Sequence, residues 1–312
     1  MAKLIGVDVG YSTVRVVSAS ERGNYKCESA VIALSVADGS AVACGDEAIS
    51  LFQRVPGSVT LVKPFSGETT PEPQYITAYF SYILKKMKMK GASVAISLPG
   101  VHDEETEGVY VKAIQKAGFG RVTVIESVYA AACGCNIKGV RNSAVINIGA
   151  SVTDMSCFEK GQQTIKKSNS FAGNAFDRAI ISKVLTDHLC RVSPEDAEKI
   201  KLELLCLSGE SSKKQTVSAI RPGLGIPKKI ELDSKDVLSA CEGVFDSLAD
   251  EISDMIRMRK VEPDKIILTG GSAKLNGLVT ALAPLIQVPI EIAEEPELSV
   301  IRGLEGLLQR IK

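Results

Sequence analysis

Ile-Gly-Val-Asp-Val-Gly-Tyr-Ser-Thr-Val-Arg-Val-Val, residues 5–17, runs from an apolar segment into a glycine turn and back into a second apolar segment. Ala-Val-Ile-Asn-Ile-Gly-Ala-Ser-Val-Thr-Asp-Met-Ser-Cys, residues 144–157, follows the same plan at a constant offset of 139 residues. Each stretch predicts a β-hairpin whose turn can present backbone N–H groups to an anion. Two such hairpins predict two related halves that face each other across a phosphate chain. The offset pairs Asp8 with Asn147, Gly10 with Gly149 and Ser12 with Ser151.

The bulk composition is that of an ordinary soluble globular protein of about two domains. The chain has 312 residues, of which 45% are apolar and 24% charged. Lys plus Arg and Asp plus Glu are equal at 37 each, so the net charge does not argue for nucleic acid as a partner. Because there are only two histidines, His102 and His188, we expect neither a histidine metal cluster nor a Ser-His-Asp triad.

The chain is expected to lie in the cytoplasm. Its N-terminus runs into the first predicted strand without a secretory apolar region, and no stretch reaches the roughly 18–20 apolar residues of a membrane span. The eight cysteines are scattered, most of them in apolar runs, which is typical of buried, reduced thiols.

Hydrophobic periodicity predicts strands that alternate with helices, which indicates an α/β fold with at least partly parallel sheets. Ser193, followed by Pro194 and two acids, is typical of a helix start. The segments 64–73 and 208–229 are expected to be loop-like, the second with some strand. Strands are expected at 3–9, 13–18, 25–34, 41–44, 93–98, 121–125, 144–148, 153–159, 163–169 and 265–269, and helices at 46–52, 74–87, 104–117, 128–135, 173–189, 197–206, 236–259 and 299–311.

The order of these segments resembles the actin, sugar-kinase and DnaK-type ATPase superfamily, and within it the MreB-like bacterial actins. One glycine turn alone would be a weak signal, whereas the ordered set is specific. The matching segments are the two phosphate loops at 5–16 and 144–157, the Leu-Pro-Gly segment at 98–100, the connecting strand and alanine-rich helix at 121–134, the glycine turn and acidic helix start at 171–177, the adenosine-contacting helix at 197–201, the Gly-Leu-Gly-Ile-Pro segment within 223–229, the adenosine loop at 267–275 and the start of the last helix at 295–296.

The resemblance implies a two-lobed actin-like ATPase fold, in which each lobe has a mixed sheet flanked by helices. Lobe I would comprise 1–140 plus 296–312, with a small subdomain at about 32–72. Lobe II would comprise 141–295, with a small subdomain at about 179–235. The implied ligands are ATP or ADP with Mg²⁺. The residues implied at the nucleotide are Gly10, Tyr11, Ser12, Thr13, Gly149, Ala150, Ser151, Gly173, Asp177, Glu198, Lys201, Gly270, Gly271 and Ser272.

The resemblance also implies roles in metal binding and hydrolysis, and here the sequence departs from the family. Asp8 would be the acid near Mg²⁺, but Asn147 stands where the family has a second Asp, so it would act only through a metal-bound water. Ser127 stands where MreB has the Glu that orients the attacking water, which leaves Glu126 as the candidate. Because the side chains of a strand alternate between its two faces, Glu126, one residue before Ser127, would point away from the attacking water. A β-bulge in the strand would point it back.

Other positions leave two interpretations open. Ala150 and Ser151 replace family glycines, and their Cβ atoms can crowd the phosphates. Glu198 and Lys201 lie three apart on a predicted helix and form either a solvated ion pair or a contact with the adenosine. Asp177 is either a first-turn helix acid or a ribose-side contact. These departures favour nucleotide binding over efficient hydrolysis.

The function implied is an ATP-binding bacterial actin that associates head to tail into filaments, with at most weak ATPase activity. The alternatives are a non-polymerising adaptor of the PilM or FtsA type, a DnaK-type chaperone or reactivating ATPase, and, last, a small-molecule kinase. The expected partner is a second copy of the chain, and partners among membrane proteins stay open. The basic run 85–90 is either a solvated helix end or a contact with anionic lipid, so attachment at the inner membrane face stays open.

Overall fold

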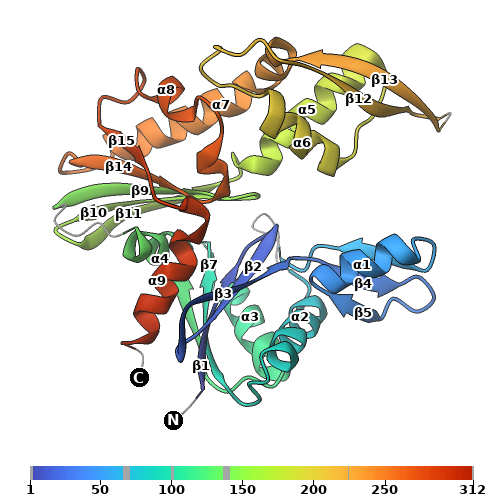
Figure 1. The fold of residues 1–312 in the computed structure, drawn as a ribbon. Coiled ribbons are helices and arrows are strands. Elements are labelled where there is room, and N and C mark those ends of the chain that lie inside the picture. Colours follow the sequence, from blue (N-terminus) through green and yellow to red (C-terminus); the bar gives the residue numbers. More distant parts are fainter. Residues whose placement is uncertain (1–2, 66–70, 100–101, 136–140, 224, 311–312) are drawn as a thin grey trace. The chain divides into compact units, whose positions relative to one another are not determined.

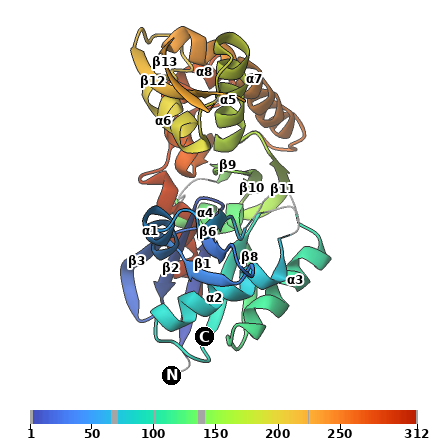
Figure 2. The same ribbon diagram turned by 90° about the vertical axis from the view of Figure 1, so that its right-hand side faces the viewer.

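The computed structural model describes residues 3–65, 71–99, 102–135, 141–223 and 225–310 (Figure 1 and Figure 2). The chain divides into two compact units, Met1–Lys138 with Glu297–Lys312, and Gly139–Pro296. Part of the predicted 64–73 loop, Gly100 and Leu224 lie outside the described residues, so the structure does not test the predictions made for them.

Unit 1 is built on a five-stranded mixed sheet. Helices α2 (Pro73–Lys86) and α3 (Glu104–Lys116) cover one face, where the strands supply apolar side chains such as Val7 and Ile96. Helices α4 (Ser127–Gly134) and α9 (Ser299–Leu308) pack against each other on the other face (Figure 1). The strand order is β3 (Glu21–Ser29), β2 (Thr13–Ser18), β1 (Leu4–Val9), β7 (Ser93–Leu98) and β8 (Val122–Glu126), with β1–β7 and β7–β8 parallel.

A second, three-stranded sheet of unit 1 corrects one strand prediction. The expected strand 25–34 is two strands, because the chain leaves β3 after Ser29 and enters a different sheet as β4 (Ile32–Ser35). Burial changes at the same point, since β3 is mostly exposed whereas Ile32, Ala33 and Leu34 are buried. The small sheet has the order β5 (Ala41–Cys44), β4, β6 (Val59–Val62) and packs on α1 (Asp46–Arg54).

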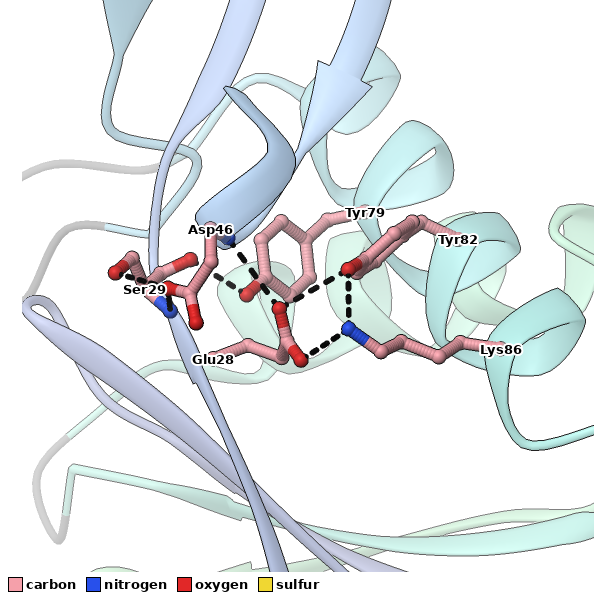
Figure 3. A network of polar contacts seen from close by, with 6 residues as sticks. All are labelled: Glu28, Ser29, Asp46, Tyr79, Tyr82 and Lys86. Carbon is pink, nitrogen blue, oxygen red and sulfur yellow. Dashed lines mark hydrogen bonds and ion pairs between the residues drawn. The ribbon is translucent and has the colours of Figure 1, made fainter. Parts of the chain in front are cut away.

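A polar network ties α1 to α2 (Figure 3). The buried Glu28 carboxylate at the end of β3 accepts hydrogen bonds from the backbone N–H of Asp46 at 3.3 Å and from the Tyr82 hydroxyl at 3.0 Å. It also pairs with the Lys86 ammonium. The Asp46 carboxylate in turn accepts from the backbone N–H and hydroxyl of Ser29, at 3.1 and 2.6 Å. Lys86, part of the basic run, therefore helps to hold α1 to α2 within unit 1.

Unit 2 repeats the five-stranded plan. Its sheet has two antiparallel pairings followed by two parallel ones, as unit 1 has. The predicted strand at 265–269 is confirmed at both ends. The strand order is β11 (Gln162–Asn169), β10 (Thr153–Glu159), β9 (Asn142–Ile148), β14 (Lys265–Thr269) and β15 (Ile290–Ile292).

A capping residue predicted from the sequence sets where one helix of unit 2 begins. The Ser193 hydroxyl accepts from the backbone N–H of Asp196, and α6 (Pro194–Leu204) begins at Pro194, so the helix start predicted at Ser193 is confirmed. The expected loop-like segment 208–229 contains β12 (Lys214–Arg221) and the start of β13 (Ile226–Asp233), which form a regular hairpin. The remaining elements are α5 (Gly173–His188), α7 (Ser234–Arg257), α8 (Leu278–Leu282) and the short 3₁₀ turns η1 (Gly271–Lys274) and η2 (Pro296–Leu298).

The two predicted glycine hairpins are confirmed, and they match in register. In unit 1 the last pair before the turn is Val9 with Val14, and in unit 2 it is Ile148 with Thr153, which is the same pair shifted by the sequence offset. The neighbouring parallel strand also carries a hydroxyl at the same place in each unit. Asp8 lies opposite Arg15 and Ser97, and Asn147 lies opposite Asp154 and Thr269.

Candidate functional site

The first hairpin turn, residues 10–13, holds four of the predicted nucleotide contacts. A Cβ at Gly10 would lie 2.5 Å from the Thr13 carbonyl oxygen, so only glycine fits there. The Ser12 carbonyl accepts from the backbone N–H of Ala30 at 2.9 Å. This bond fixes the turn against the segment that joins β3 to β4.

Asp8 lies two residues before this turn and is nearly buried, with 8% of its surface exposed. Its Oδ1 accepts from the Ser97 hydroxyl at 2.9 Å, and its Oδ2 lies 3.6 Å from the Arg15 guanidinium. Burial raises the pKa of the Asp8 carboxyl, while Arg15 and Ser97 act in the opposite direction. Arg15 and Ser97 therefore both favour the ionised form of Asp8.

Glu126 and Ser127 lie where β8 ends and α4 begins. Glu126 pairs with Leu98, and the β7–β8 register runs to that pair without a bulge, so the bulge that could have re-aimed Glu126 is absent. Ser127 is buried, and its hydroxyl donates to the Leu98 carbonyl at 2.8 Å. The position at which the resemblance places a water-orienting Glu is thus occupied by a short side chain that bonds to the neighbouring strand.

In unit 2, three predicted binding segments meet at the second hairpin turn, residues 149–152. The Gly149 carbonyl accepts from the Gly173 backbone N–H at 3.1 Å and from the Ser272 hydroxyl at 2.8 Å. The next amide of α5, Asn174, donates to the Ala150 carbonyl at 2.6 Å. The first two amides of α5 therefore hold the turn in place.

Gly270 fixes the loop 267–275, which the sequence predicts to contact adenosine, against this hairpin. It has a φ of +83°, and a Cβ there would lie 2.3 Å from the Ile148 carbonyl oxygen and 2.8 Å from Asn147 Oδ1. The Thr269 hydroxyl donates to that Oδ1 at 3.1 Å. The Asn147 oxygen is thus engaged within the sheet. Ser151 is buried, Ala150 is half-buried, and Gly271 and Ser272 begin η1.

Lys201 is buried, with its side chain 6% exposed, and pairs with Asp177 rather than with Glu198, which is exposed. Its ammonium donates to Asp177 Oδ2 at 3.0 Å and to the Gly173 carbonyl at 3.1 Å, and lies 2.8 Å from Asp177 Oδ1. Burial raises the pKa of Asp177, and Lys201 opposes that shift. The solvated Glu198–Lys201 pair is therefore wrong, and the Lys201–Asp177 pair clamps α6 to the start of α5.

The structure adds four residues to those predicted. Ser97, Thr269 and Arg15 are the strand neighbours of Asp8 and Asn147, and the Lys63 ammonium lies 5.3 Å from the centroid of the Tyr11 ring. Arg15 could have been predicted from the sequence. Asp8 lies two residues before the turn and Arg15 two residues after it, so the two are partners in the hairpin. Lys63 could not, since it follows β6, which belongs to a different sheet.

Comparison with known proteins adds an independent finding. The family profile described as MreB/Mbl protein matches residues 2–312. The cell shape-determining protein Mbl of Bacillus subtilis (strain 168) is 26% identical over 99% of this chain and 97% of its own length. The cell shape-determining protein MreB of Escherichia coli (strain K12) is 24% identical over 87% of this chain and 82% of its own length.

Solved structures share the fold. The structure of MreB5 of Spiroplasma citri bound to ADP has a TM-score of 0.89 at 20% identity, covering 100% of this chain and 97% of that chain. The MamK double helical filament has a TM-score of 0.83 at 17% identity, covering 98% of each chain. The predicted actin-like α/β fold is thereby confirmed.

Proposed function

The chain belongs to the MreB/Mbl family, and on that premise we propose that it binds ATP or ADP and assembles head to tail with further copies of itself into filaments. The observation that carries the proposal is the pair of glycine hairpins in the same register, each with a polar residue two places before its glycine. Such turns present backbone N–H groups to phosphate. We further propose that the two units correspond to the two lobes that the sequence predicts.

The ligand and the assembly are known for structural neighbours. MreB5 of Spiroplasma citri has been solved with ADP and with AMPPNP, and MamK as a double helical filament. These findings describe those proteins, and they motivate the same ligand class and self-association here. A head-to-tail contact that does not close into a ring generates a filament. Each copy therefore needs only two complementary surfaces, one at each of its ends.

Of the two residues predicted to act near Mg²⁺, Asp8 offers a carboxylate and Asn147 an amide oxygen. Mg²⁺ is usually held by one or two carboxylates together with phosphates and water. Asp8 is engaged by Ser97 and Arg15, and the Asn147 oxygen accepts from Thr269. Within the described ranges, no three His, Cys, Asp or Glu side chains are grouped to hold a metal ion. No step of the proposed function therefore passes through the metal.

Sedimentation of the purified chain tests the filament proposal. With ATP, we expect the protein to pellet above a critical concentration, and without nucleotide we expect it to stay in the supernatant. If no pellet forms at any concentration with ATP, ADP or AMPPNP, the filament proposal fails. The adaptor of the PilM or FtsA type, which the short Ser127 side chain favours, would then be the better proposal.

We expect hydrolysis to be slow because no acid occupies the position of Ser127. The double variant Ser127→Glu with Asn147→Asp should therefore release phosphate from ATP about tenfold faster or more, since a placed general base contributes at least that much. Single-turnover phosphate release measures the rate. Ser127→Ala is the matched control, because it loses the bond to Leu98 without adding an acid. A wild-type rate equal to that of the double variant would contradict the proposal.

We propose a cytoplasmic location, and membrane attachment rests only on the basic run. Among the described residues, the structure has no helix of sufficient length and apolarity to span a bilayer. In the run 85–90, Lys86 is paired with Glu28, while Lys85, Lys88 and Lys90 are exposed. Contact with anionic lipid is therefore less strongly supported by these three exposed lysines than by the four lysines of the run in the sequence.

A further inference from the structure

Ser29, the last residue of β3, is held by side chains of two helices (Figure 3). β3 is the edge strand of its sheet, so the N–H groups on its outer side have no strand to bond to. The Asp46 carboxylate, at the start of α1, accepts from the backbone N–H and from the hydroxyl of Ser29, at 3.1 and 2.6 Å. The Tyr79 hydroxyl of α2 donates to the Ser29 carbonyl at 2.7 Å. Side chains of α1 and α2 therefore hold both polar groups of the Ser29 backbone.

The start of α1 is tied to the same segment through its own backbone. The Gly45 N–H donates to the Val31 carbonyl at 2.9 Å, and the Asp46 N–H donates to the buried Glu28 carboxylate at 3.3 Å. Gly45 has a φ of +66°, and a Cβ there would meet the Glu28 carboxylate, so this close approach favours glycine. The Asp46 carboxylate therefore has a fixed position beside the end of β3, although its residue is exposed to solvent.

The segment that Asp46 holds is also the one that fixes the first hairpin turn. The Ala30 N–H donates to the Ser12 carbonyl at 2.9 Å, and Thr13 pairs with Ser29 in the β2–β3 register. Because a trans peptide group is planar, its C=O and its N–H point in opposite directions. The bond from Ala30 therefore turns the Thr13 N–H to the side of the turn that faces away from the end of β3. This N–H is one of the donors that such a turn can offer to phosphate.

We propose that Asp46 is a positioning residue for the turn that is proposed to hold phosphate. By holding Ser29, it keeps the Ala30 N–H on the Ser12 carbonyl. That bond in turn orients the Thr13 N–H toward phosphate. The inference deepens the proposed function and rests on it, since it names a residue outside the turn on which nucleotide affinity depends.

Equilibrium titration of ATP tests the inference with a matched pair of variants. Asp38, in the turn between β4 and β5, is also exposed and accepts from the backbone N–H and the hydroxyl of Ser40, at 3.1 and 2.7 Å. Asp46→Ala should bind ATP about tenfold more weakly than the wild type, because it loses two charge-assisted hydrogen bonds to the segment that holds the turn. Asp38→Ala loses the same two kinds of bond within the small sheet and should keep the wild-type affinity.

A conservative variant and amide exchange separate positioning from general support of the fold. Asp46→Asn keeps a side-chain oxygen that can accept both bonds from Ser29, so its ATP affinity should stay within about threefold of the wild type. In protein without nucleotide, hydrogen exchange of the Ala30 amide, followed by NMR, should be faster in Asp46→Ala than in the wild type. Asp38→Ala should leave the exchange of this amide unchanged.

Three results would overturn the inference while the proposed function stands. They are wild-type ATP affinity in Asp46→Ala, an equal loss of affinity in Asp38→Ala, and unchanged exchange of the Ala30 amide in Asp46→Ala. If Asp46→Ala does not fold, Ser29→Ala, which removes only the hydroxyl bond, takes its place and should bind ATP about threefold more weakly. Wild-type affinity in that variant would then overturn the inference. If the wild type binds no nucleotide, the inference and the proposed function are both overturned.

Discussion

Replacing Gly303 by alanine is expected to lower the free energy of unfolding of the chain by about 3 kcal/mol or more, because overpacking against backbone leaves no flexible neighbour to move. A Cβ at Gly303 would lie 1.7 Å from the Ala130 carbonyl oxygen and 2.5 Å from its carbon. Both atoms belong to the backbone of α4. Helices α4 and α9 would have to separate to admit one methyl group.

The loss should be large because α9 completes unit 1. The chain leaves unit 1 after Lys138 and returns only at Glu297, so α9 is the element that brings the two parts of this unit together. The contact is reciprocal, since a Cβ at Gly134 on α4 would lie 1.9 Å from the Ser299 carbonyl oxygen. Helix α9 also covers Gly6 of β1, so a displaced helix would uncover the centre of the sheet.

Gly306, one turn further along α9, is the matched control. A Cβ there would meet nothing within 4 Å. Gly306→Ala should therefore leave the stability unchanged or raise it by about 0.5–1 kcal/mol, the usual gain for alanine over glycine within a helix. Urea unfolding of both variants measures the difference. Equal midpoints for Gly303→Ala and the wild type would contradict the close approach of the two helices.

Sequence reasoning succeeded where one local signal specified a structure. The apolar alternation around Gly10 and Gly149 predicted both hairpins, and the register follows the repeat because each turn has the same length. Ser193 and Pro194 likewise marked the start of α6, which begins at Pro194 as predicted. The alternation of apolar residues in a strand and the glycines of a turn depend only on residues that are close in sequence. Both can therefore be recognised from the sequence alone.

Sequence reasoning failed where distant residues decide the outcome. Glu198 and Lys201 share a helix face, but Lys201 turns inward to Asp177, which lies 24 residues earlier on α5. The strand predicted at 25–34 was divided because the chain changes sheets, which no residue in it signals. Whether a bulge re-aims Glu126 depends on its pairing with β7. Each of these answers requires the partner element to be placed first.

Lys201→Met is expected to destabilise unit 2 by about 3–5 kcal/mol, because it removes one partner of a buried ion pair and leaves the other charge uncompensated. The Asp177 side chain is only 11% exposed. The ammonium also holds the Gly173 carbonyl at the start of α5. Its loss would free the first turn of α5, whose amides fix the second hairpin turn. Thermal or urea unfolding measures the effect, and Lys199→Met, an exposed lysine of the same helix, is the control.

The double variant Lys201→Met with Asp177→Leu separates support of the fold from contact with the nucleotide. Replacing both members of a buried pair by apolar side chains is often neutral, so we expect most of the stability to return. Lys201 donates hydrogen bonds to Asp177 Oδ2 and to the Gly173 carbonyl, and both contacts hold α6 to the start of α5. Because this role is structural, we expect ATP affinity to return with the stability. If the double variant is stable but binds ATP about tenfold more weakly or worse, one member of the pair contacts the nucleotide directly, as the resemblance implied.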